Sequence, residues 1–333
     1  NVTVPHGIRG RATTARFRLS TSGNLLPTGG AADGEVEDHE VQLVGQPLVG
    51  VFRGRNFFLD INGNGKWDRI AGGDMVYAFG GIGDVPVIGD WNGDGFDEIG
   101  VYRPLNSKWY LDSNANGRWD PGVDTVYQFG LKGLDIPVAG DWNNDGTDEI
   151  GTYRPTNSKF YLDLDGSGKW SGTGVGADGA FLFGAVGDVP LIGDWNNDGI
   201  DDLGVHRNNE FRLDLNGNHT WDGTGPGQDA IHVFRNPGDV PVAEDFNADG
   251  QDQIGTWKSG LYTVDWNANG TWDKQQGGDM VMNFGGISTD TPIVGKWAPP
   301  ASPLLAAPGV REVCLLYTSP SPRDPLRYRV CRL

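Results

Sequence analysis

The stretch GDWNGDGFDEI, residues 89 to 99, sets the pattern for most of the chain. Its core, an Asp followed by an aromatic residue, Asn, any residue, Asp and Gly, occurs four times. The first Asp of each copy is Asp90, Asp141, Asp194 or Asp245, and Lys296 takes this place in an incomplete fifth copy. The intervals between copies are 51, 53, 51 and 51 residues. A chain that repeats at a nearly fixed interval is built from repeated structural units, so one unit indicates the architecture.

Each unit contains four short runs typical of β-strands. In the second unit we expect strands at 98–103, 108–112, 125–129 and 136–142, which are rich in β-branched and aromatic residues and bounded by Gly, Asn, Asp and Pro. No stretch has an apolar repeat of helical period, so we expect essentially no helix. Four strands in a unit of about 50 residues fit one propeller blade. The sequence predicts an all-β, five-bladed β-propeller over residues 46–297.

The two ends of the array predict how the ring closes. The array opens at residue 46 on the second strand of a unit and ends at residue 297 on the first strand of a unit. We expect the strand at 291–297 to pair with the strand at 48–53, which leaves no free edge. In the blade closed in this way, the first and second strands come from opposite ends of the array, so no loop joins them. Five blades should therefore carry four such loops, as the motif count requires.

Composition limits the classes of function. The 333 residues include 53 Gly and 20 Pro, as expected for a turn-rich β-protein, and 37% are hydrophobic, enough for a packed core. No apolar run could span a membrane and no signal peptide is present, so we expect no membrane insertion. A formal charge of −18 argues against nucleic acid as a partner. We expect a monomeric module of a larger chain, extracellular or at the cell surface.

The chain ends differ from the repeats. Residues 15–44 contain the string DGEVED at 33–38 and resemble the last strands of a GEVED-type domain, a β-sandwich module of large secreted bacterial proteins. This resemblance implies that residues 1–45 are a fragment of such a domain. Residues 298–310 form a Pro/Ala-rich linker. Residues 311–333 resemble translated sequencing-adapter read-through, and we interpret them as a non-native tail; a basic anchoring tail is the alternative.

The repeated motif also carries the chemistry. Counting from its first Asp, oxygen-bearing side chains stand at positions 1, 3 and 5, Gly at 6, a backbone carbonyl at 7, and carboxylates at 8 and 9. Hard oxygen ligands at this spacing suit Ca²⁺. The EF-hand is excluded because position 12 is not Glu and lies inside a strand. The candidate ligands are Asp90, Asn92, Asp94, Phe96, Asp97 and Glu98; Asp141, Asn143, Asp145, Thr147, Asp148 and Glu149; Asp194, Asn196, Asp198, Ile200, Asp201 and Asp202; and Asp245, Asn247, Asp249, Gln251 and Asp252.

These loops, which we call the first acidic loops, resemble those of FG-GAP and VCBS repeats in integrin-type propellers. The resemblance covers residues 46–297 and implies about four Ca²⁺ sites. It makes position 9 the last ligand, which favours Glu98, Glu149 and Asp202. The fourth loop has Gln253 there and should bind most weakly. Asp at position 8 departs from the family pattern, and whether it binds metal or caps the turn is left open. Metal-free Asx-turns are the alternative for all four loops.

A second set of loops follows the third strand of each unit. These second acidic loops have similar spacing but mostly two carboxylates each, so weak Ca²⁺ binding and metal-free Asn/Gly turns are both open. Their members are Asp60, Asn62, Asn64 and Asp68; Asp112, Asn114, Asn116 and Asp120; Asp163, Asp165, Ser167 and Ser171; Asp214, Asn216, Asn218 and Asp222; and Asp265, Asn267, Asn269 and Asp273.

Aromatic and basic residues also recur once per unit. We expect Trp67, Trp119, Trp170, Trp221 and Trp272 to pack between blades, with sugar stacking as the alternative. A ring of near-identical sugar sites would be a multivalent lectin. We expect Arg53, Arg103, Arg154, Arg207 and Lys258 to form structural ion pairs.

The sequence favours a non-catalytic module for adhesion or ligand recognition. An enzyme needs a unique acid, base or nucleophile that breaks the repeat, and the carboxylates here nearly all recur at equivalent positions. A five-bladed glycoside hydrolase with paired carboxylates is a minor alternative, as is a purely structural spacer. The ligand, protein or glycan, is not written in the sequence.

Overall fold

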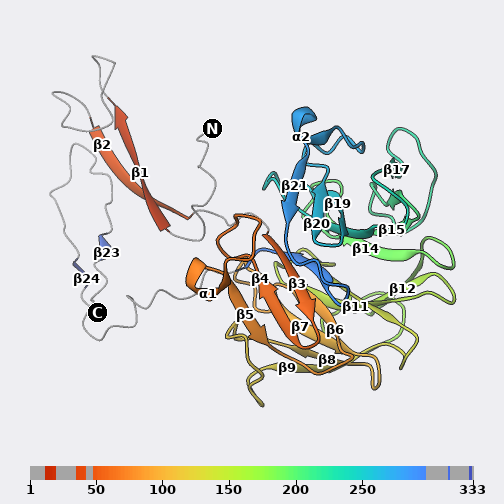
Figure 1. Cartoon of the computed structure of the whole chain (residues 1–333). Helices are drawn as coiled ribbons and strands as arrows, with labels where there is room; N and C mark the ends of the chain where they lie inside the picture. The colour runs from red at the N-terminus through yellow and green to blue at the C-terminus, as the bar shows by residue number, and fades with distance from the viewer. Residues whose placement is uncertain (1–11, 20–34, 43–47, 298–313, 316–329, 332–333) are drawn as a thin grey trace, which may run out of the picture. The chain divides into compact units, whose positions relative to one another are not determined.

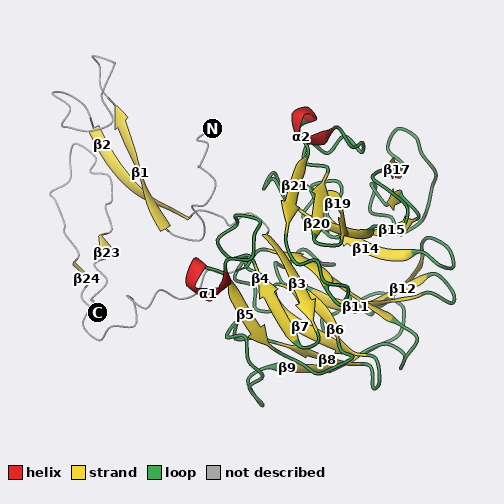
Figure 2. Ribbon diagram, viewed as in Figure 1, coloured by secondary structure: helices red, strands yellow, loops and turns green. Residues whose placement is uncertain are grey.

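The computed structural model describes residues 12–19, 35–42, 48–297, 314–315 and 330–331. Residues 48–297 form five antiparallel four-stranded sheets, the blades of a β-propeller (Figure 1, Figure 2). This confirms the predicted fold class.

Each blade contains a first, second, third and fourth strand, in that order across its sheet. Blade 1 consists of β22 (Thr291–Gly295), β3 (Leu48–Arg53), β4 (Asn56–Leu59) and β5 (Met75–Ala78). Blade 2 consists of β6 (Val85–Gly89), β7 (Glu98–Arg103), β8 (Lys108–Leu111) and β9 (Thr125–Gln128). Blade 3 consists of β10 (Ile136–Gly140), β11 (Glu149–Arg154), β12 (Lys159–Leu162) and β13 (Gly179–Leu182). Blade 4 consists of β14 (Val189–Gly193), β15 (Asp202–Arg207), β16 (Glu210–Leu213) and β17 (Ala230–Val233). Blade 5 consists of β18 (Val240–Glu244), β19 (Gln253–Lys258), β20 (Leu261–Val264) and β21 (Met280–Asn283).

The ring closes as the sequence predicts. β22 pairs with β3 in antiparallel register, from Thr291 opposite Phe52 to Gly295 opposite Leu48. The five first strands, β6, β10, β14, β18 and β22, contact one another in a closed cycle and so line the centre of the ring. The last strand of the propeller therefore completes its first blade, and β3 is not left as an edge.

The core lies between the blades. The first five residues of every second strand are buried, because neighbouring blades cover both faces of the sheet there. The Trp of each second acidic loop packs edge-on against a Phe of the preceding blade, as Trp119 does on Phe79 with ring centroids 6.1 Å apart. The same contact joins Trp67 to Phe284 across the closing junction. The expected inter-blade packing of these Trp residues is confirmed.

The recurrent basic residues also have the expected structural role. In every blade the basic residue at the end of the second strand pairs with a buried Asp in the turn before the first strand. The pairs are Arg53–Asp290, Arg103–Asp84, Arg154–Asp135, Arg207–Asp188 and Lys258–Asp239, at 2.6 to 2.8 Å.

Two single-turn helices are small departures from the expected absence of helix. They are α1 (Arg69–Gly72) and α2 (Lys274–Gly277), in the second acidic loops of blades 1 and 5. Each ends at a glycine in the left-handed region, Gly73 at φ 112° and Gly278 at φ 116°, a conformation that a side chain disfavours. Both helices lie beyond the motif positions and leave them unchanged.

Outside the propeller the structure describes two strand pairs. β1 (Ala12–Leu19) pairs with β2 (Glu35–Gln42) in antiparallel register. β23 (Cys314–Leu315) pairs with β24 (Val330–Cys331). The linker predicted at 298–310 lies outside the described residues.

Candidate functional site

The first acidic loops join first and second strands, so they surround the centre of one face of the ring. In each, the carboxylate at position 1 holds the turn. Asp90 Oδ1 accepts hydrogen bonds from the N–H groups of Gly93 at 2.7 Å and Asp94 at 3.2 Å, and Asp90 Oδ2 accepts one from Gly95 at 2.7 Å. The aspartates at 141, 194 and 245 accept equivalent bonds. The turn of each loop therefore folds around its position-1 carboxylate.

The residue at position 9 completes the oxygen cluster, because it begins the second strand and points back into the loop. Glu98 is 4% exposed, and its Oε2 accepts a hydrogen bond from Trp91 N–H at 3.2 Å. Its buried Oε1 has no hydrogen-bond partner. Burial, with the carboxylates of Asp94 and Asp90 nearby, raises the pKa of Glu98 to about 9. A bound dication would compensate this concentration of negative charge.

The next two loops repeat this convergence of positions 3 and 9. The Asn143 side-chain amide donates to Glu149 Oε1 at 2.7 Å, and that of Asn196 donates to Asp202 Oδ2 at 3.0 Å. Burial is the largest cause that raises the pKa of Glu149 and of Asp202, each to about 8. In all four loops the backbone N–H at position 7 donates a hydrogen bond to the position-5 carboxylate. The donors are Phe96, Thr147, Ile200 and Gln251.

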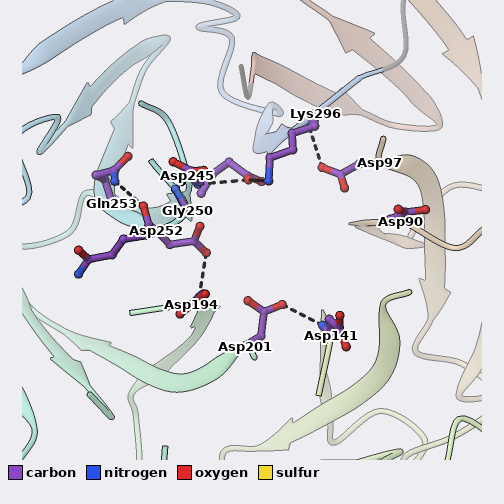
Figure 3. A network of polar contacts seen from close by, with 12 residues as sticks. Asp90, Asp97, Asp141, Asp194, Asp201, Asp245, Gly250, Asp252, Gln253 and Lys296 are labelled. Atoms are coloured by element: carbon purple, nitrogen blue, oxygen red, sulfur yellow. Dashed lines mark hydrogen bonds and ion pairs between the residues drawn. The ribbon is translucent and has the colours of Figure 1, made fainter. Parts of the chain in front are cut away.

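Position 8 does not join the loop cluster. Each position-8 side chain turns to the neighbouring blade and accepts a hydrogen bond from the backbone N–H at position 1 there. Figure 3 shows Asp97, Asp201 and Asp252 in these bonds. The acceptor–donor pairs are Asp97–Lys296 at 2.6 Å, Asp148–Asp90 at 2.9 Å, Asp201–Asp141 at 2.9 Å and Asp252–Asp194 at 3.1 Å. In return each position-8 N–H donates to the position-1 carbonyl of that neighbour. Position 8 thus joins adjacent blades.

These four aspartates line a central cavity of about 440 Å³. Burial, with neighbouring carboxylates, raises the pKa of Asp97 and of Asp201 to about 7, and burial raises those of Asp148 and Asp252 well above the usual range. Glu244 and Lys296 also line the cavity, and their side chains approach to 3.6 Å.

Glu244 supplies the acceptor that the closing junction lacks. Blade 1 has no first acidic loop, so no position-8 Asp can reach the N–H of Asp245; Glu244 Oε1 accepts from that N–H at 3.2 Å instead. The other blades have Gly where blade 5 has Glu244. A Cβ there would lie 2.5 to 2.8 Å from the neighbouring position-8 carboxylate. Because the closing junction has no position-8 Asp, there is room for Glu, and the ring keeps one carboxylate at each of its five junctions between blades.

In the fourth loop, Gln253 occupies position 9. Its Oε1 accepts from Asn247 N–H at 3.1 Å, and its Nε2 donates to Asp249 Oδ1 at 3.4 Å. An amide donor thus lies where the other loops place a carboxylate oxygen. This contact is consistent with the expectation of weakest binding here, which stays a prediction.

The second acidic loops are built on the same plan. In blade 3, Asp163 Oδ2 accepts from Gly168 N–H at 2.6 Å and Asp165 Oδ1 accepts from Ser167 N–H at 3.0 Å. One carboxylate oxygen each of Asp163, Asp165 and Asp178 lies within 4.8 Å of the others, so this group could hold a metal ion. The sequence prediction missed Asp178, which lies seven residues beyond the motif.

A comparison with models of known protein families matches none of them, and a comparison with curated protein sequences finds no significant match. Among the described residues, no helix is long and apolar enough to cross a membrane.

Proposed function

We propose that the chain is a calcium-binding, non-catalytic propeller module of a larger secreted or cell-surface protein, and that it acts in adhesion or ligand recognition. The observation that supports the calcium assignment is Glu98, whose buried Oε1 has no hydrogen-bond partner and whose carboxylate lies near those of Asp94 and Asp90. Ca²⁺ accepts six to eight hard oxygen ligands in flexible geometry, whereas Mg²⁺ demands a small octahedral shell. The four first acidic loops therefore favour Ca²⁺.

The non-catalytic part of the proposal rests on the partners of the recurrent carboxylates. The four position-8 aspartates of the central cavity accept hydrogen bonds from backbone groups of the adjacent blade, and the aspartates before the first strands pair with Arg or Lys. Both roles are architectural and recur around the ring. A catalytic acid or base would be expected to break that repetition.

Calorimetric titration of Ca²⁺ into chelator-treated protein tests the metal assignment. One ion per occupied loop adds about 2.7 kcal/mol to the free energy of unfolding when free Ca²⁺ is a hundredfold above its dissociation constant. Chelation should therefore lower the melting temperature, and Mg²⁺ should restore it poorly. Glu149→Gln should abolish or weaken one site, whereas Asp148→Asn, its neighbour in sequence, should leave the ion count unchanged. Absence of binding, with no effect of chelator on melting, would contradict the proposal.

The second candidate is a multivalent lectin. Trp67, Trp119 and Trp170 expose 37%, 36% and 43% of their surface beside the second acidic loops, although each also packs on a Phe. A glycan array probed with the calcium-loaded protein separates the candidates. Binding that Trp119→Ala weakens would favour the lectin, and silence would favour a module that binds protein.

A further inference from the structure

We propose that the five second acidic loops are a further set of divalent-cation sites, each completed by a buried aspartate outside the loop motif. The completing residues are Asp74, Asp124, Asp178, Asp229 and Asp279, one per blade. They are 0% to 7% exposed. These sites share no ligand with the first acidic loops, so the inference stands apart from the proposed function.

The five aspartates are held alike. One oxygen, Oδ2, accepts a hydrogen bond from the backbone N–H at position 9 of the loop. The distances are 2.5 Å from Asp68 to Asp74, 2.6 Å from Asp120 to Asp124, 2.5 Å from Ser171 to Asp178, 2.6 Å from Asp222 to Asp229 and 2.5 Å from Asp273 to Asp279. The other oxygen, Oδ1, is buried and makes no hydrogen bond of ordinary distance and angle in any of the five. A buried carboxylate oxygen that lacks a well-formed hydrogen bond is costly, and its repetition at one place in five blades points to a ligand.

In blade 3 the completing aspartate lies beside two carboxylates of the loop. Asp178 is 2% exposed, and one of its oxygens lies within 4.8 Å of oxygens from Asp163 and Asp165. Among the described residues, no Lys or Arg forms an ion pair with any of the three. Three carboxylates this close repel one another unless a cation lies between them. Oxygen-only donors select a hard cation, and Ca²⁺ accepts an irregular set of oxygen ligands more readily than Mg²⁺ does.

The carboxylate count supports the same site in every blade. Blades 1, 2, 4 and 5 have Asn at position 3 and Asp at position 9, whereas blade 3 has Asp165 at position 3 and Ser171 at position 9. With the completing aspartate included, each loop has three carboxylates. The exchange in blade 3 therefore moves one negative charge within the loop and conserves the total that sets cation affinity.

The test is a Ca²⁺ titration of the full chain after chelation, by calorimetry and by ion counting in native mass spectrometry. We expect more than four ions, up to nine if all loops fill. Asp178→Asn should remove one ion or weaken one site about tenfold or more. Ser171→Asp, at an exposed position, should add a fourth carboxylate in blade 3 and tighten one site about tenfold, a gain that misfolding cannot imitate. Far-UV circular dichroism checks that both variants fold.

Glu149→Gln, in the first acidic loop of the same blade, is the matched control. It should remove a different ion, so the double variant with Asp178→Asn should lose two. Four ions in the wild type, with no effect of Asp178→Asn or Ser171→Asp, would overturn this inference and leave the proposed function standing. Loss of an ion in Asp178→Asn but none in Glu149→Gln would support it and count against the first-loop assignment.

Discussion

The two acidic loops of one blade differ in how they gather oxygen atoms. In blade 3, both the first loop (141–149) and the second loop (163–171) begin with an Asp that accepts hydrogen bonds from its own turn. They lie on the same face of the ring, since one joins the first strand of the blade to the second and the other joins the third to the fourth. A Cβ at Gly166 would lie 3.8 Å from Glu149 Oε1. Beyond this shared plan they differ in the source of their last carboxylate.

The first loop contains its last carboxylate at position 9 and has an additional carboxylate at position 8. The additional one, Asp148, leaves the loop to bond the neighbouring blade. The second loop contains too few and obtains Asp178 from beyond the motif. A loop motif thus identifies the residues able to bind a cation, whereas the surrounding strands decide which of them meet.

The largest effect expected from this comparison is on stability. Asp201→Ala removes the acceptor for Asp141 N–H at the junction of blades 3 and 4, and should lower the free energy of unfolding by about 1–3 kcal/mol, the cost of leaving a part-buried donor unpaired. Urea denaturation at pH 5, where the pKa of about 7 keeps Asp201 mostly protonated, measures this without the effect of its charge. Asp201→Asn keeps an acceptor and is the control. Calcium stoichiometry should not change in either variant; loss of an ion would show that position 8 belongs to the loop site.

An intermediate effect is expected from pH in the metal-free protein. Burial, with Glu244 nearby, raises the pKa of Asp201 from its ordinary 3.8 to about 7, so the folded state retains a proton that the unfolded chain releases. Stability from this group is present below about pH 4 and is lost as the pH rises through about 7. The charged groups that act on it are Asp141, Asp194, Glu244, Asp148 and Asp252.

Denaturation midpoints at pH 5 and pH 8 in excess EDTA measure this dependence. Wild type should lose more stability between the two values than Asp201→Asn. Equal losses would mean that the position-8 carboxylate, which the second acidic loops lack, does not cause this pH dependence. Asp163→Asn is the comparison variant, because the pKa of Asp163, in a second acidic loop, is also raised to about 7. It shows how much of the pH dependence of stability arises outside the central cavity.

The sequence predicted the fold well because the fold depends on local, repeated features. Strand residues, turn residues and the phase of the array determine the blades, and the closing pair of β22 and β3 follows from that phase. The candidate site was only partly predictable. The carboxylates of Asp148 and Glu149 lie apart, one bonded to the next blade and one in the loop, because strand alternation sends adjacent side chains to opposite sides. Nothing in the string Asp148-Glu149 itself tells this.

The completing aspartates escaped prediction for a different reason. They follow position 9 by six, four, seven, seven and six residues, so no fixed spacing marks them. The intervening segments differ as well, with a helical turn in blades 1 and 5 and an isolated bridge in the other three. The available signal was a single Asp before every fourth strand, which can be recognised only when the blades are aligned on that strand.

The smallest expected effect concerns the fourth of the first acidic loops. Gln253 there places an amide donor 3.4 Å from Asp249 Oδ1, whereas the other three loops have Glu or Asp at position 9. Gln253→Glu restores the carboxylate and should tighten Ca²⁺ binding at this one site about tenfold, or about 1.4 kcal/mol, because ligand charge tunes affinity. Calorimetry should show the change in the weakest resolved step alone. The reverse change in blade 2, Glu98→Gln, should weaken one site by a similar factor. If Gln253→Glu leaves every binding step unchanged, position 9 does not complete the first loop. The two kinds of loop would then not differ in the source of their last carboxylate as described above.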